Sequence, residues 1–145
     1  MLSQFRIDIM DGTSPVSIPS VGIKDIDDQH KQLIDHLERL VYWIDRGHGF
    51  SASLDALGQI QQYVSSHFAF EEAFLRNHKY PKIDDHVAQH IAFKADLDRL
   101  TEMVIAGNDA SDELLHTLVR WIKTHIGEED LEYGQYFGKS TVASA

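Results

Sequence analysis

Four long segments of this chain carry apolar residues at steps of three and four positions, as Leu33, Leu37 and Leu40 do in the first of them. This spacing lines up side chains along one face of an α-helix, so each segment is expected to be a helix with one buried face. Segments of about five turns each, joined by short loops, favour an antiparallel bundle. The chain is therefore predicted to be all-α, as an up-down-up-down four-helix bundle.

Glycine, serine and proline residues set the expected limits of the helices. Gly47 and Gly49 should end the first helix. Ser51 or Ser53 should cap the start of the second, and Pro81 should close it. The helices are expected at about 25–45, 51–80, 84–105 and 111–126, in a bundle domain at 23–138 with an N-terminal arm at 1–22 and a tail at 139–145.

Charge and composition exclude several classes of function. The 145 residues hold 13 Lys and Arg against 23 Asp and Glu, and the net charge of −10 disfavours binding to nucleic acid or to an anionic membrane surface. The chain has no cysteine, which removes disulfides, thiolate-bound metals and thiol nucleophiles. The first twenty residues show neither a signal peptide nor a membrane span, so a cytoplasmic protein is expected.

Five of the nine histidines fall on the apolar faces, where core residues are expected. A single histidine on such a face is more often a hydrogen-bonded core residue than a metal ligand. That explanation weakens here, because each of the four predicted helices directs at least one histidine inward. These five are candidate metal ligands: His30, His67, His86, His90 and His125. The other four are expected in a turn, at the edge of a buried face or near a helix end: His36, His48, His78 and His116.

Two acidic residues extend this candidate set. Glu71 lies four residues after His67, on the same buried face, where an ionised carboxylate is costly unless it is paired or bound to a metal. Asp130 lies five residues after His125, about 140° around an ideal helix, so the two would meet only if the helix were distorted. Gly127 between them is where a π-type bulge is easiest. Imidazole and carboxylate ligands without thiolate suit iron, and manganese stays open.

Taken in order, four motifs resemble the bacterial hemerythrin family over Val21 to about Phe137. They are DxQH, HFxxEE, YPxxxxHxxxH and WxxxHIxxxD, at 27–30, 67–72, 80–90 and 121–130. The resemblance implies a non-haem centre of two iron ions joined by a bridging hydroxide or oxide. It further implies that His86, His90 and His125 bind one iron and that the other has two histidines and an open position. Those two are His30 and His67, and Glu71 and Asp130 would bridge the irons.

The function implied by this resemblance is reversible binding of molecular oxygen, held as hydroperoxide at one iron, for oxygen storage, transport or sensing. An enzyme is not expected on this basis. The alternative is a di-iron enzyme that acts on peroxide, nitric oxide or ferrous iron. A bundle that binds a partner, with iron in a structural or regulatory role, ranks last, and the sequence identifies no protein partner.

The oxygen pocket is the place where this sequence departs from the resemblance. In oxygen-carrying relatives bulky aliphatic residues are expected to wall the pocket at the positions of Ile122 and Gly127. Ile122 fits that role, whereas the glycine would leave one wall missing. A more open pocket, with faster autoxidation or exchange, is the resulting hypothesis.

Overall fold

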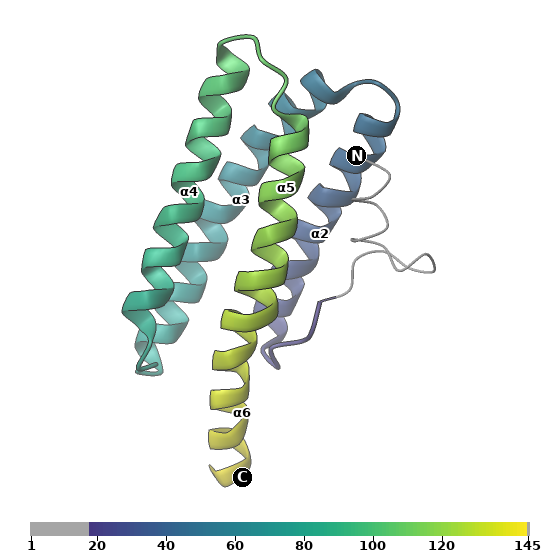
Figure 1. The fold of residues 1–145 in the computed structure, drawn as a ribbon. Helices are drawn as coiled ribbons and strands as arrows, with labels where there is room; N and C mark the ends of the chain where they lie inside the picture. Colours follow the sequence, from purple (N-terminus) through teal and green to yellow (C-terminus); the bar gives the residue numbers. More distant parts are fainter. Residues whose placement is uncertain (1–17, 145) are drawn as a thin grey trace.

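The computed structural model describes residues 18–144, with side chains described as far as Gly138, and within this range the fold is a bundle of four helical rods (Figure 1). Each rod packs on the next one in sequence, and the last packs back on the first, which closes the bundle. The predicted all-α four-helix architecture is therefore confirmed. The rods are α2 (Lys24–Asp45), α3 (Gly49–Asn77), α4 (Ile83–Ile105), and a continuous run of α5 (Ser111–Trp121), η1 (Ile122–Asp130) and α6 (Leu131–Ser144).

The start of α3 differs from the expected one. The chain turns at Gly47, whose φ of +81° suits glycine, and α3 already begins at Gly49. The hydroxyls of Ser51 and Ser53 donate to the carbonyl oxygens of His48 and Phe50, one turn back. Because these serines bond backward inside the helix, neither of them caps it, and the predicted N-cap is wrong.

The core has two apolar clusters, and the buried histidines lie between them. The larger cluster fills most of the bundle, from Leu33 on α2 to Ile126 on η1. The smaller one closes the end of the bundle where α2 begins, with Val21, Ile26, Leu75, Tyr80 and Tyr133. Along α2, His30 stands between these two clusters, so the polar layer is enclosed by apolar packing on both sides.

The last rod contains a π-helix of nine residues, Ile122–Asp130. The sequence predicted a π-type distortion around Gly127, and the structure confirms it. In a π-helix the hydrogen bonds run from residue i to i+5, so residues five apart lie closer to the same side of the helix than they do in an α-helix. This geometry turns both His125 and Asp130 into the core.

Most of the predicted arm at 1–22 lies outside the described residues. At the other end, the backbone of residues 139–144 continues α6, where a frayed tail was expected. The domain limits of 23–138 stay a prediction. In the part of the chain that the structure describes, no helix is both long enough and apolar enough to cross a bilayer.

Candidate metal centre

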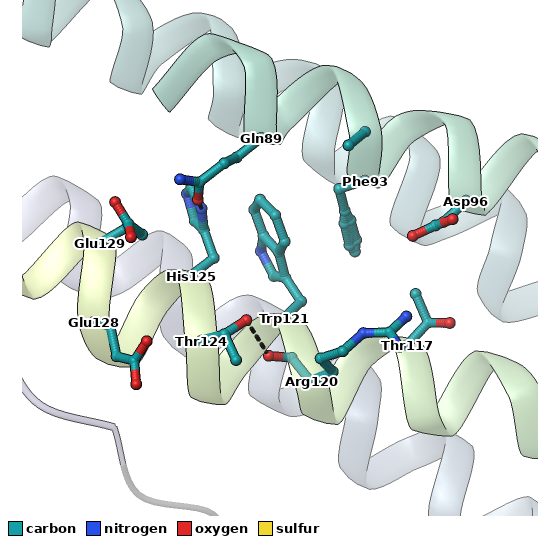
Figure 2. A pocket seen from close by; sticks show the side chains of 11 residues that line it. Gln89, Phe93, Asp96, Thr117, Arg120, Trp121, Thr124, His125, Glu128 and Glu129 are labelled. Carbon is teal, nitrogen blue, oxygen red and sulfur yellow. Dashed lines mark hydrogen bonds between the residues drawn. The ribbon is translucent and has the colours of Figure 1, made fainter. Parts of the chain in front are cut away.

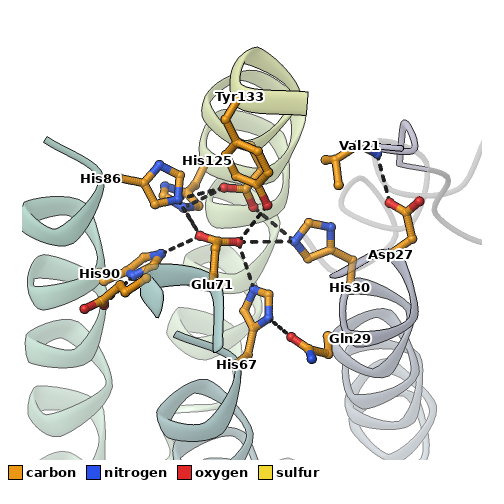
Figure 3. A network of polar contacts seen from close by, with 12 residues as sticks. Val21, Asp27, Gln29, His30, His67, Glu71, His86, His90, His125 and Tyr133 are labelled. Carbon is orange, nitrogen blue, oxygen red and sulfur yellow. Dashed lines mark hydrogen bonds and ion pairs between the residues drawn. The ribbon is translucent and has the colours of Figure 1, made fainter. Parts of the chain in front are cut away.

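The structure brings all seven predicted ligand side chains together in one buried cluster (Figure 3). None of the seven is more than 4% exposed. They come from all four rods, which is why no single segment of the sequence contains the site. The members are His30 from α2, His67 and Glu71 from α3, His86 and His90 from α4, and His125 and Asp130 from η1.

The cluster divides into two groups of four that share Glu71. In each group one ligand atom from every residue lies within 4.8 Å of the others, which is compact enough for one metal ion. Since both groups contain the same carboxylate, the two positions must be neighbours. The groups are Glu71 with His86, His90 and His125, and Glu71 with His30, His67 and Asp130.

The two oxygens of Glu71 are directed to different groups. Its Oε1 contacts His86 Nε2 and lies 3.0 Å from His90 Nε2, with His125 Nε2 at 3.9 Å. Its Oε2 faces the other side, 3.4 Å from His67 Nε2 and 4.0 Å from His30 Nε2. One carboxylate thus spans both groups.

Asp130 repeats this division. Its Oδ1 lies 3.0 Å from His86 Nε2 and 3.1 Å from His125 Nε2, whereas its Oδ2 lies 3.0 Å from His30 Nε2. Two carboxylates that each offer one oxygen to each histidine group form the arrangement expected of bridging ligands.

Several atoms of the cluster are buried without a hydrogen bond: both ring nitrogens of His30, Nε2 of His125 and both oxygens of Asp130. Some of them are only 3.0 Å from a potential partner, but the angles are not those of hydrogen bonds. Buried polar atoms are rarely left unsatisfied, and these converge on one another as ligands of a shared centre do. The donor set fits metal ions.

The protonation equilibria of the cluster reflect its mixture of acids and bases. Burial raises the pKa of Glu71, but the imidazoles of His125, His67 and His86 around it outweigh burial and hold that pKa well below its usual range. Burial likewise lowers the pKa of His86, and contacts with Asp130 and Glu71 outweigh it and raise the pKa to about 10. Without a metal the carboxylates are therefore ionised and His86 carries a proton, so a cation bound here replaces protons.

Three of the five histidines are oriented by a second polar residue, which the sequence did not assign. Oε1 of Gln29 lies 2.6 Å from Nδ1 of His67, and Oε1 of Gln89 lies 2.6 Å from Nδ1 of His125. Each glutamine directly precedes a different cluster histidine in the sequence, His30 or His90. Adjacent residues on a helix point about 100° apart, so each glutamine reaches a neighbouring helix instead of its neighbour in sequence. The third partner is Glu72, whose Oε2 lies 2.8 Å from Nδ1 of His90.

Two buried tyrosines also belong to the site and were not predicted. The hydroxyl of Tyr133 on α6 donates to Glu71 Oε2 at 3.0 Å. The hydroxyl of Tyr63 on α3 donates to the backbone carbonyl of Gln29, and its ring stacks on His67. Burial raises the pKa of both phenols, so both stay neutral hydrogen-bond donors. Tyr133 lies three residues after Asp130, a helical spacing that could have indicated it.

Aromatic rings cover the faces of two histidines in the group that contains three histidines, His86, His90 and His125. Phe68 stacks on His90 with ring centroids 3.7 Å apart, and Trp121 stacks on His125 at 3.8 Å. These contacts fix the planes of the imidazoles before any ligand is bound. Such pre-organisation lowers the cost of assembling a metal site.

A surface groove of about 360 Å³ between α4 and the last rod reaches the edge of the cluster (Figure 2). Gln89, Trp121 and His125 are among the residues that line it, together with the acidic residues Glu128 and Glu129. His125 therefore belongs both to the lining of this groove and to the centre. A second groove, of about 330 Å³ between α2 and α3, is lined by residues that include Tyr63 and His67.

The four histidines left out of the predicted set lie elsewhere. His48, His78 and His116 are exposed and His36 is half-buried. His78 stacks on Phe74 and contacts that residue's carbonyl oxygen through Nδ1. None of the four belongs to the two groups of the centre.

Comparison with known proteins gives a family match that covers most of the chain. Residues 21–137 match the family model described as the hemerythrin HHE cation binding domain. Bacteriohemerythrin of Pseudomonas paraeruginosa is 31% identical over 114 residues, which cover 79% of this chain and 74% of the relative. That of Stenotrophomonas maltophilia is 33% identical over 117 residues, with the same shares, and that of Clostridium acetobutylicum is 28% identical over 121 residues, 78% and 92%.

Proposed function

Because this chain belongs to the hemerythrin family, we propose that its buried cluster holds two iron ions and binds molecular oxygen reversibly. His86, His90 and His125 are the proposed histidine ligands of one iron, and His30 and His67 those of the other. Glu71 and Asp130 are the proposed bridges. Storage, transport or sensing of oxygen would each use this chemistry.

The observation that supports two metal ions best is the division of the carboxylate oxygens. Glu71 and Asp130 each direct one oxygen to each histidine group. The distances from these oxygens to the histidine Nε2 atoms are 3.0–4.0 Å, apart from a shorter contact between Glu71 and His86. A carboxylate that binds a single metal ion needs only one group of histidines near its oxygens, so a carboxylate that spans two groups favours two metal ions. Imidazole and carboxylate ligands without sulfur favour iron or manganese, and the family match favours iron.

The unequal number of histidines supports a site for a small ligand. With Glu71 and Asp130 as bridges, two histidines on one side against three on the other leave the two-histidine side with one ligand fewer. A pair of ferrous ions, when bound, supplies the two electrons that oxygen takes up reversibly. On that side His30 is fully buried, whereas His67, with the ring of Tyr63 stacked on it, lines the groove between α2 and α3, so water is kept from His30 more completely than from His67.

Ile122 and Gly127 are proposed to shape the oxygen pocket. Ile122 is buried in the main core, three residues before His125, and can serve as a wall. Gly127 is partly exposed, and a Cβ added there would meet only the Ile122 carbonyl oxygen, at 3.3 Å. We expect Gly127→Leu to slow autoxidation relative to Gly127→Ala. Equal autoxidation rates of the wild type and both variants would remove Gly127 from the proposal.

Reversible oxygenation can be tested directly. The iron-loaded protein is reduced without oxygen, exposed to oxygen, and followed by its visible charge-transfer absorption. A band that forms, disappears on deoxygenation and returns on re-exposure supports an oxygen-binding protein. A transient band that decays while peroxide, nitric oxide or ferrous iron is consumed supports the enzyme alternative, which the groove beside His125 would favour by admitting solvent. Absence of bound iron would contradict both.

A further inference from the structure

Three histidines of the cluster differ in what their outer ring nitrogen contacts. Nδ1 of His67 and Nδ1 of His125 each meet the amide oxygen of a glutamine, whereas Nδ1 of His90 meets the carboxylate of Glu72. Amide and carboxylate oxygens both accept hydrogen bonds, so in all three rings the proton is assigned to Nδ1. The Nε2 lone pair then faces the centre in each case. His90 differs from the other two in that the group beside its Nδ1 carries a negative charge.

Helix α3 holds the His90 ring from three directions. Glu71 Oε1 lies 3.0 Å from Nε2, and Glu72 Oε2 lies 2.8 Å from Nδ1, so consecutive residues of one helix contact opposite nitrogens of one imidazole. Phe68 stacks on the ring with an interplanar angle of 3°. The ring therefore has little freedom to turn, and the bond to Glu72 is kept.

The carboxylate of Glu72 is partly shielded from solvent. Its side chain is 20% exposed, and its second oxygen lies 3.8 Å from an Arg76 guanidinium nitrogen on the next turn. A histidine whose outer nitrogen donates to a carboxylate is a more basic metal ligand than one that donates to a neutral group. A more basic ligand favours the more highly charged state of the metal.

We propose that Glu72 is a positioning residue that acts through His90 to make the metal of the three-histidine group the more easily oxidised of the two. This rests on the proposed function, because it requires two metal ions. In the couple concerned, a ferric ion takes up one electron and becomes ferrous, and no bond to Glu72 forms or breaks. The charge of Glu72 stabilises the ferric side of that couple.

The test is the reduction potential of the iron-loaded full chain in Glu72→Gln. The variant keeps an oxygen that can accept from His90 Nδ1 and removes only the charge. The potential is measured by stepwise reduction with dithionite in the presence of mediator dyes. We expect it to rise, and a tenfold change in the ferric-to-ferrous ratio corresponds to about 59 mV for a one-electron couple. Glu128→Gln is the matched control, because it removes the same charge from an exposed site on η1.

A rescue variant separates charge from structure. Gln89→Glu places a carboxylate behind His125, in the same histidine group, so Glu72→Gln combined with Gln89→Glu should restore the wild-type potential. The role of Glu72 would be overturned, with the proposed function left intact, by either of two results. One is a Glu72→Gln potential equal to that of Glu128→Gln, and the other is a shifted potential that Gln89→Glu does not return to the wild-type value. A wild-type chain that binds no iron would overturn the proposed function together with this inference.

Discussion

Asp130 Oδ1 lies 3.1 Å from His125 Nε2, although the two residues are five positions apart on one continuous rod. In an α-helix this spacing would turn their side chains about 140° away from each other. The π-helix of Ile122–Asp130 reduces this offset, because its hydrogen bonds link residues five apart. The backbone irregularity is therefore what allows one rod to supply both a histidine and a carboxylate to the centre.

Asp130→Asn should lower the affinity for the metal of the two-histidine group more than that for the other metal. Asp130 Oδ2 and Glu71 Oε2 are the two carboxylate oxygens near His30, and this side has only two histidines to hold its metal once one carboxylate charge is lost, against three on the other side. We expect a loss of more than about tenfold, since even outer partners of metal ligands cost 10- to 100-fold. Competition with a chelator measures it. Glu129→Gln, one residue earlier and outside both groups, should leave both affinities unchanged.

The metal-free protein should lose stability as the pH rises. Burial lowers the pKa of His86, but Asp130 and Glu71 outweigh it and raise the pKa from 6.5 to about 10. A raised histidine pKa stabilises the fold fully below pH 6.5, and that stability is lost as the pH approaches 10. Denaturant unfolding of the chelator-treated protein across this interval should therefore show a falling free energy of unfolding.

The metal-loaded protein should not show that loss. Metal and proton compete for the same Nε2 atoms, so metal binding strengthens as the pH rises and adds stability over the same interval. A stripped protein whose stability is flat or rises between pH 6.5 and 10 would contradict the assigned protonation of His86.

Tyr133→Phe should lower the stability of the protein and leave the four-helix fold unchanged. The substitution removes a buried hydrogen bond to the charged Glu71, and such bonds contribute about 1.5–3 kcal/mol. The free energy of unfolding, measured on the metal-loaded protein, should fall by that order. Tyr80→Phe, in the same apolar cluster, is the control and should cost less. Equal effects of the two substitutions would mean that the bond to Glu71 contributes little.

Gly134→Ala should also be destabilising, for a steric reason. A Cβ at Gly134 on α6 would lie 2.9 Å from the Val21 Cα, a backbone atom that cannot move aside cheaply. Overpacking of this kind costs about 1–3 kcal/mol. Gly138→Ala on the same helix meets nothing within 4 Å and should be neutral or slightly stabilising. Thermal unfolding of the two variants compares them directly.

Most of the fold could be predicted from the sequence because the apolar periodicity is strong in all four rods. The π-helix was also predictable, since the five-residue spacing of His125 and Asp130 made sense only with a distortion at Gly127. The start of α3 was missed, because Ser51 and Ser53 are good caps by residue type but bond to carbonyls one turn back. Residue type alone does not say in which direction a hydroxyl bonds.

The five histidines and Glu71 could be singled out for a similar reason, since a polar residue on an apolar stripe is conspicuous, whereas Asp130 was included through the expected distortion and the family resemblance. Their outer partners could not be singled out. Gln29 adjoins His30 in the sequence but orients His67, and the tertiary packing of α2 against α3 decides this pairing. Tyr133 reads as an ordinary core aromatic until its hydroxyl is placed beside Glu71. Side-chain contacts of this kind depend on how each helix is rotated about its axis and shifted along its neighbour, and these quantities cannot be read from a single sequence.

The number of iron ions per chain tests the shared histidine–carboxylate cluster most directly. Metal-free protein is titrated with ferrous iron in the absence of oxygen, and bound iron is quantified after separation from the free ion. We predict saturation at two irons per chain for the wild type, because Glu71 belongs to both groups and Asp130 directs one oxygen toward each of them. Saturation at one iron, or no binding, would contradict a two-metal centre.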